Sequence, residues 1–180
     1  MKVNNEHRLE GARICDSPNF SDRLNEEISL LVIHNISLPP GQFGNNFVDQ
    51  FFTNKLDPNK DPYFEEIYEM KVSSHLFIDR EGLLTQFVPF DKVAWHAGIS
   101  EFKGREDCNE FSIGIELEGT DDLEYPSNQY KTLIEVTKAL MDYYPEIKVD
   151  NIVGHKDIAP VRKTDPGEAF DWDLYKSSLS

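Results

Sequence analysis

The chain has 180 residues, 39% of them hydrophobic, and carries 18 Lys and Arg against 33 Asp and Glu, a formal charge of −15. This length predicts one domain, residues 1–180, with a sizeable core and an irregular N-terminal segment, 1–27, packed on it. The charge excludes nucleic acid and anionic membranes as expected partners, because both require a basic surface. No obligate protein partner is indicated.

The N-terminal residues contain no apolar segment of secretory-signal length, and no apolar run approaches a membrane span. The two cysteines, Cys15 and Cys108, predict free thiols rather than a disulfide framework. A cytoplasmic location is therefore expected.

The first strong element is Ser29–His34, SLLVIH, whose branched apolar residues predict a central strand covered on both faces. A loop rich in proline and glycine, 35–44, follows His34 directly. Strand ends of this kind often carry functional residues, so His34 is a candidate. From Asn45, aromatic and apolar residues at helical spacing predict a short amphipathic helix with its aromatics in the core.

Two strands, Val72–Asp79 and Leu83–Val88, are predicted to form a hairpin around the turn Arg80-Glu81-Gly82. His75 would lie inside the first of them, either as a buried neutral histidine that donates to a backbone carbonyl or facing a site.

The stretch Phe111–Gly119 alternates between apolar and polar or small residues, which predicts a strand with two different faces. Ser112 and Gly114 are small and would leave space above the sheet, into which Glu116 would project. That placement suits a general base, although alternation alone also fits a solvated outer face.

A long amphipathic helix is expected from an N-cap at Ser127 to a stop at Pro145, with its apolar stripe in the core. A brief strand, Asn151–Gly154, would deliver His155 to the edge of the sheet. A last short helix is expected within Phe170–Leu179.

The segment Gly154–Gly167, GHKDIAPVRKTDPG, holds His155 and Asp165. Pro160 and Pro166 exclude an undisturbed helix, because proline lacks a backbone N–H and restrains the residue before it. The segment is therefore predicted to be a structured loop, and it carries a small excess of positive charge.

His34, His155 and Asp165 together fit a catalytic zinc site, which uses three protein ligands and keeps a fourth position for water. The wide spacing is weak evidence, since it lacks a local H-E-x-x-H motif. The alternative is that both histidines are structural and that Asp165 caps the turn before Pro166.

Several segments of the chain, in order, resemble the AmpD-type 1,6-anhydro-N-acetylmuramyl-L-alanine amidases, and together they cover most of the chain from Leu30 to Trp172. They are LLVIHNISLPPGQFG (30–44), DPYF (61–64), FVPFDKVAWHAG (87–98), GRE (104–106), CN (108–109), FSIGIELEGTD (111–121), GHKDIAPVRKTDPG (154–167) and FDW (170–172). The resemblance implies an α/β fold of the α+β type, in which a central mixed β-sheet is flanked by helices, as in the wider amidase and peptidoglycan-recognition proteins.

The resemblance also implies roles for individual residues. His34, His155 and Asp165 match the family's zinc ligands, for one Zn²⁺ per chain, and Asp165 stands where many relatives outside the AmpD group have cysteine. Glu116 matches the catalytic acid/base and Lys163 the cationic catalytic residue. A salt bridge to a nearby acid is the other interpretation of Lys163.

The implied reaction is hydrolysis of the amide between 1,6-anhydro-N-acetylmuramic acid and L-alanine in small anhydromuropeptides, a step of peptidoglycan recycling. Because the stem peptide is anionic, local cations are expected to meet it. The candidate substrate-binding residues are Asn35, Lys71, Trp95, His96 and Arg105. His96 is expected to be a positioned group beside the metal site rather than a ligand of the metal, and Trp95 would either stack on a sugar or fill the core. Asp107 stands where the family pattern is often basic, so contacts to the peptide carboxylates are expected to differ. A non-catalytic muropeptide-binding module on the same fold is the alternative function.

Overall fold

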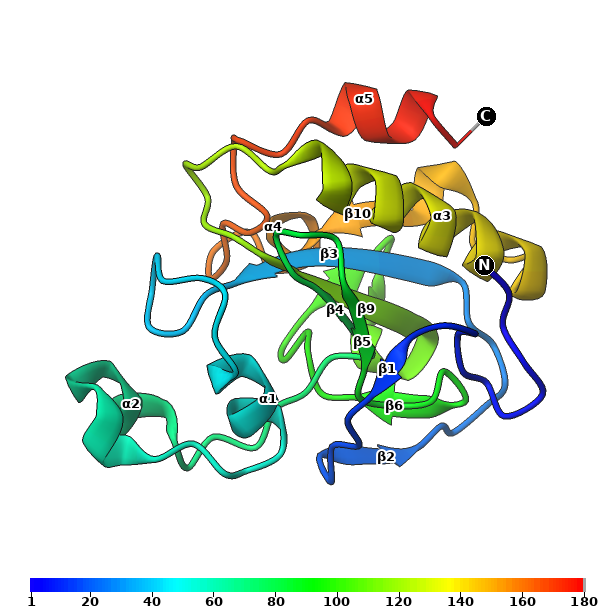
Figure 1. The fold of residues 1–180 in the computed structure, drawn as a ribbon. Coiled ribbons are helices and arrows are strands. Elements are labelled where there is room, and N and C mark those ends of the chain that lie inside the picture. The colour runs from blue at the N-terminus through cyan, green and yellow to red at the C-terminus, as the bar shows by residue number, and fades with distance from the viewer. Residues whose placement is uncertain (180) are drawn as a thin grey trace.

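A six-stranded mixed sheet runs through the centre of the molecule in the computed structural model, which describes residues 1–179 (Figure 1). Every neighbouring pair in the sheet is parallel except β4 and β5, which are antiparallel. The sheet order is β1 (Arg13–Ile14), β5 (Leu84–Gln86), β4 (Leu76–Ile78), β9 (Ser112–Glu118), β3 (Leu30–Ile36) and β10 (Ile152–Gly154). The mixed sheet predicted from the sequence is confirmed.

The two long strands, β3 and β9, pair along seven positions at the centre of the sheet. Every residue of β9 is buried, because helices and loops cover both faces. The interpretation of Ser112, Gly114, Glu116 and Glu118 as a solvated face is therefore wrong.

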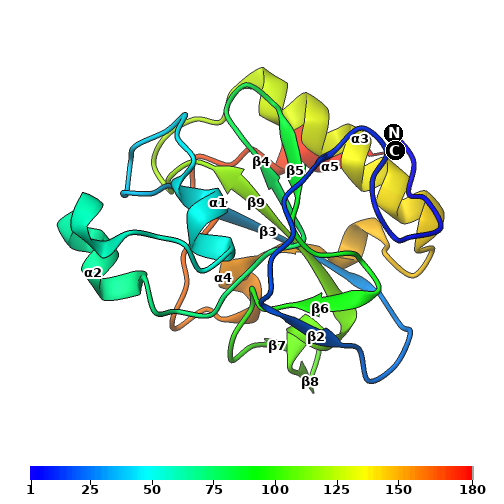
Figure 2. The same ribbon diagram turned by 60° about the horizontal axis from the view of Figure 1, so that its bottom comes forward.

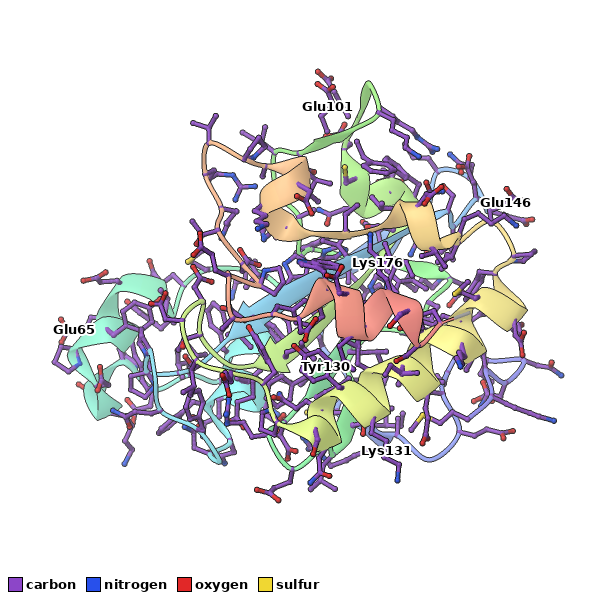
Figure 3. All side chains as sticks on the ribbon, turned by 90° about the horizontal axis from the view of Figure 1, so that it is seen from above. Glu65, Glu101, Tyr130, Lys131, Glu146 and Lys176 are labelled. Atoms are coloured by element: carbon purple, nitrogen blue, oxygen red, sulfur yellow. The ribbon has the colours of Figure 1, made fainter. Side chains whose placement is uncertain are left out.

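Helices α3 (Ser127–Tyr143) and α5 (Trp172–Ser177) lie on one side of the sheet (Figure 1). Tyr130 lies between them and accepts a hydrogen bond from the Asp171 backbone N–H at 2.7 Å, whereas the adjacent Lys131 points outward (Figure 3). The apolar stripe of α3 packs on the sheet, as predicted. Pro126 rather than Ser127 occupies the N-cap, and the helix ends at Tyr143, before Pro145.

The opposite side carries α1 (Phe47–Phe52), the short 3₁₀ helix η1 (Pro58–Lys60) and α2 (Pro62–Ile67), which reaches away from the body of the protein (Figures 1 and 2). Asp61 caps α2 by accepting the Tyr63 N–H at 2.9 Å. Phe51 and Phe52 of α1 are buried in a second apolar cluster with Phe64, and Phe47 packs against it partly buried. The predicted helix and its core face are therefore confirmed.

Several short elements were not predicted. β2 (Phe20–Asp22) pairs with β6 (Lys92–Ala94), and β7 (Glu101–Phe102) pairs with β8 (Arg105–Glu106) (Figure 2). The segment 1–27 is thus not wholly irregular, since β1 and β2 come from it. Two further 3₁₀ turns are η2 (Cys108–Phe111) and η3 (Val149–Asn151).

The predicted hairpin strands are shorter than expected, and His75 lies just before β4 rather than inside a strand. The segment after Gly154 is also not loop throughout, because one helical turn, α4 (His155–Ile158), opens it and ends before Pro160. Asp157 stabilises its start by accepting the Gly154 N–H at 2.7 Å. Within residues 1–179, no helix combines the length and the hydrophobicity that crossing a membrane requires.

Candidate metal centre and active site

The candidate site lies in a cleft of about 630 Å³ near the carboxyl ends of the central strands. Parallel pairing of β10 with β3 sets Gly154 opposite Ile33, so the next residues, His155 and His34, come together. The cleft residues that bear on the chemistry are His34, Glu116, His155, Lys163 and Asp165, and Tyr63, Met70 and Trp95 also line it.

The structure brings His34, His155 and Asp165 together as one cluster, whose ligand atoms all lie within 4.8 Å of one another. The two Nδ1 atoms are 3.0 Å apart, and each lies 3.1 Å from Oδ2 of Asp165. The Asp165 carbonyl accepts the Lys156 N–H at 3.0 Å, which fixes the loop that carries the carboxylate.

The hydrogen bond made by Nε2 of His155 shows that its other ring nitrogen, Nδ1, is free to bind a cation. Nε2 lies 3.1 Å from the carbonyl oxygen of Ala97, which can only accept, so Nε2 carries the proton. In neutral His155 the Nδ1 lone pair then faces both the Asp165 carboxylate and His34. A lone pair and a carboxylate repel each other at this distance unless a cation lies between them, so the donor set fits a metal ion.

The ionisation of the cluster agrees with this arrangement. Burial lowers the pKa of His34 to about 4, although the adjacent Asp165 carboxylate acts in the opposite direction. Burial would raise the pKa of Asp165, but the two adjacent histidines outweigh it and hold that pKa well below its usual value. A neutral imidazole beside an ionised carboxylate is the state that binds metal.

Glu116 lies on β9 directly beside His34 and is only 8% exposed. Its Oε2 has no hydrogen-bond partner among residues 1–179. Burial raises the pKa of this carboxyl well above its usual value, and the negative charge of Asp165 adds to the effect, whereas Lys163 opposes it. A carboxyl group in such a position can accept and release a proton.

Lys163 lines the cleft from the loop after α4, where its backbone N–H donates to the Ala159 carbonyl at 3.0 Å. It forms no ion pair with any of the described residues, so the salt-bridge interpretation is not supported. The neighbouring Arg162 is used differently, since it donates to the carbonyls of Ala97 and Ile99 at 2.7 and 2.9 Å.

Of the five candidate substrate-binding residues, Asn35, Trp95 and His96 line the cleft. The Asn35 amide donates to Asp121 Oδ1 at 2.8 Å and to the Pro166 carbonyl at 3.2 Å, so it also ties the cleft loops together. Trp95 is half-buried, and its Nε1 donates to Ser21 Oγ at 3.3 Å.

Arg105 and Lys71 do not line the cleft, contrary to expectation. The Arg105 guanidinium pairs with Glu27 at 2.7 Å and lies 3.8 Å from the centre of the Phe111 ring. Lys71 is exposed between two residues that do line the cleft.

Sequence reasoning missed Asn109, whose side-chain oxygen accepts the backbone N–H groups of His96 and Ala97 at 3.1 and 2.8 Å. The only sequence signal was its place in the matched CN dipeptide. It also missed Asp121 and Tyr63 as lining residues, because their loops are placed by tertiary contacts.

Known sequences match this chain over nearly its full length. The 1,6-anhydro-N-acetylmuramyl-L-alanine amidases AmpD of Escherichia coli (strain K12) and Haemophilus influenzae are each 55% identical to it, over 173 and 172 residues. These matches cover 96% and 95% of this chain and 94% of each relative.

Solved structures of amidases also resemble this chain. A crystal structure of a selenomethionine AmpD derivative superposes with a TM-score of 0.97, at 51% identity and over 100% of both chains. The E. coli amidase AmiD, solved with anhydro-N-acetylmuramic acid-L-Ala-D-gamma-Glu-L-Lys, gives a TM-score of 0.62 at 29% identity, over 95% of this chain and 60% of AmiD. The sequence profile of the N-acetylmuramoyl-L-alanine amidases matches residues 24–168. The chain therefore belongs to the N-acetylmuramoyl-L-alanine amidase family.

Proposed function

We propose that this chain hydrolyses the amide between the lactyl group of 1,6-anhydro-N-acetylmuramic acid and L-alanine in cell-wall turnover muropeptides, with one zinc ion bound by His34, His155 and Asp165. The observation that carries the proposal is the convergence of these three side chains beside Glu116 in one cleft. The names of the relatives support the substrate. Action in the cytoplasm, as part of peptidoglycan recycling, belongs to the same proposal.

The donor set suits zinc in particular. Tetrahedral zinc with bonds of about 2.0–2.1 Å to nitrogen and oxygen holds its ligand atoms about 3.3 Å apart. The ligand atoms here are separated by 3.0–3.1 Å. Two histidines and one carboxylate leave a fourth position for water or substrate, as catalytic zinc sites do.

A zinc ion held by His34, His155 and Asp165 would polarise a carbonyl and would lower the pKa of water towards about 7. Glu116 accepts a proton from the water as its oxygen bonds to the lactyl carbonyl carbon. Glu116 then gives that proton to the alanine nitrogen as the C–N bond breaks, so one water yields a carboxylic acid and an amine. Lys163 stabilises the negative charge that develops on the carbonyl oxygen.

The cleft suits a ligand of this size. Its volume of about 630 Å³ lies within the range of 300–1,000 Å³ that is usual for small-molecule sites. Trp95 and Tyr63 are aromatic lining residues of the cleft, and Lys163 supplies positive charge to it.

The test is release of free stem peptide from purified anhydromuropeptide, measured by chromatography. We expect cleavage that a chelator abolishes and added zinc restores. Glu116→Gln is the matched control, since it keeps the shape of the side chain and removes its acid/base function. Binding of the muropeptide without chelator-sensitive cleavage would instead support the non-catalytic binding module.

A further inference from the structure

Two consecutive residues, His96 and Ala97, contact both candidate histidine ligands. The Nδ1 atom of His96 lies 2.9 Å from Nε2 of His34, and the carbonyl oxygen of Ala97 lies 3.1 Å from Nε2 of His155. The two ligands come from different parts of the chain, yet one short segment meets the outer nitrogen of each.

Asn109 fixes the backbone of this segment. Its Oδ1 accepts the N–H groups of both His96 and Ala97, at 3.1 and 2.8 Å. One side-chain oxygen therefore holds the two residues that hold the two histidines. Arg162 adds a second anchor by donating to the Ala97 carbonyl at 2.7 Å.

The imidazole of His96 is held in a fitted space on β9. A Cβ atom added to Gly114 would lie 2.5–2.7 Å from three atoms of that ring, so only glycine leaves room for it. Nε2 of His96 lies 3.1 Å from Oγ of Ser112. The space expected above Ser112 and Gly114 is thus filled by His96 and is not open to substrate.

Metal binding dictates where the protons lie along this row of side chains. If Nδ1 of His34 binds a cation, the proton of its neutral ring must be on Nε2. Nε2 then donates to Nδ1 of His96, which leaves the His96 proton on Nε2, directed at Ser112. Each contact in the row has one donor and one acceptor in this arrangement.

We propose that His96 and Asn109 are positioning residues for the metal site: Asn109 fixes residues 96 and 97, from which the His96 ring and the Ala97 carbonyl aim the Nδ1 atoms of His34 and His155 at the metal. The role rests on the proposed metal site. For His96 it specifies the expected positioning role, in place of the role in binding substrate. Partners of this kind typically change metal affinity by about 10–100-fold when removed.

The experiment measures zinc affinity by competition with a fluorescent chelator, independently of turnover. We expect His96→Ala and Asn109→Ala each to weaken zinc binding by about 10–100-fold. His96→Asn places an amide oxygen near the position of Nδ1 and Asn109→Asp keeps an acceptor oxygen, so both should retain affinity close to that of the wild type. His75→Asn is the matched control, because His75 is a buried histidine with no hydrogen bond to either ligand.

Nitrogen NMR of the zinc-loaded wild-type chain gives a second readout that does not depend on any variant folding. We expect a His96 proton on Nε2 and none on Nδ1, whereas the opposite tautomer would overturn the proposal. Wild-type zinc affinity in folded His96→Ala and Asn109→Ala would overturn only the positioning role. A wild-type chain that binds no zinc would overturn the proposed function itself.

Discussion

His34 and Glu116 occupy paired positions on β3 and β9, two parallel strands at the centre of the sheet. Adjacent strands lie about 4.8 Å apart, and paired residues project from the same face. The backbone pairing therefore fixes the distance between the first candidate ligand and the candidate proton carrier. We therefore expect mutation to separate two functions at these neighbouring positions: metal binding by His34 and proton transfer by Glu116.

Removing a ligand should remove the metal. We expect His34→Ala and Asp165→Ala each to hold far less than one equivalent of zinc after dialysis, because two donors remain where three converge. Glu116→Gln should keep the zinc and lose turnover, since the amide cannot accept the proton. Metal analysis and peptide release on the same preparations separate the two effects. Near-normal turnover in Glu116→Gln would show that another group is the base.

Lys163 should act on rate rather than on metal content. We expect Lys163→Met to lower kcat by about 10²–10³-fold, the usual cost of losing one group that stabilises an oxyanion, with zinc content unchanged. Lys156→Met is the control, because it removes one positive charge from the same segment. The Lys156 side chain is not among those that line the cleft. Equal loss of rate in both variants would point to general electrostatics instead.

The parts of the fold that follow from local periodicity were predictable. The buried run that forms β3, the alternation of β9 and the apolar stripe of α3 each carry a clear pattern, and each was found close to the expected bounds. The short strands β1, β2, β6, β7 and β8 carry no such pattern, because two or three residues are too few to show one.

The candidate site likewise has parts that the sequence predicted and parts that it did not. The motifs around His34, Glu116, His155 and Asp165 identified residues that the structure does bring together. Arg105 was expected to bind substrate, but its guanidinium pairs with Glu27 outside the cleft. Glu27 is distant in sequence, so this pairing could not be predicted. The space above Gly114 was misread for a related reason, since only the folded path of the loop shows that a ring fills it.

The contact between Gly114 and His96 can be measured as a coupling. In the wild-type background we expect Gly114→Ala to lower the free energy of unfolding by about 1–3 kcal/mol, because the added methyl overlaps the ring. In a His96→Ala background the ring is gone, so the same change should cost little. Urea unfolding of the zinc-free variants gives the four values of this cycle. Equal costs in the two backgrounds would mean that the added methyl does not overlap the His96 ring.

His75 should make the stability of the fold depend on pH. Its Nδ1 accepts the Gly114 N–H and its Nε2 donates to the Lys92 carbonyl, so the ring is held neutral. This matches the first of the two roles considered for His75 from the sequence, a buried neutral histidine that donates to a backbone carbonyl. Burial, with the positive charge of Arg23, lowers its pKa from 6.5 to about 3.

The sign follows from proton binding. Between pH 6.5 and about 3 the unfolded chain binds a proton at His75 that the folded chain does not, so stability is lost as pH falls through this window. One such group costs about 1.4 kcal/mol per pH unit inside the window. We expect the stability advantage of the wild type over His75→Asn to shrink by about 2 kcal/mol between pH 7 and pH 5. Urea unfolding of zinc-free protein at both pH values measures this difference, in which the contributions of groups unchanged between the two chains, including His34, cancel. Parallel stability curves for the two chains would show that His75 titrates normally in the folded state.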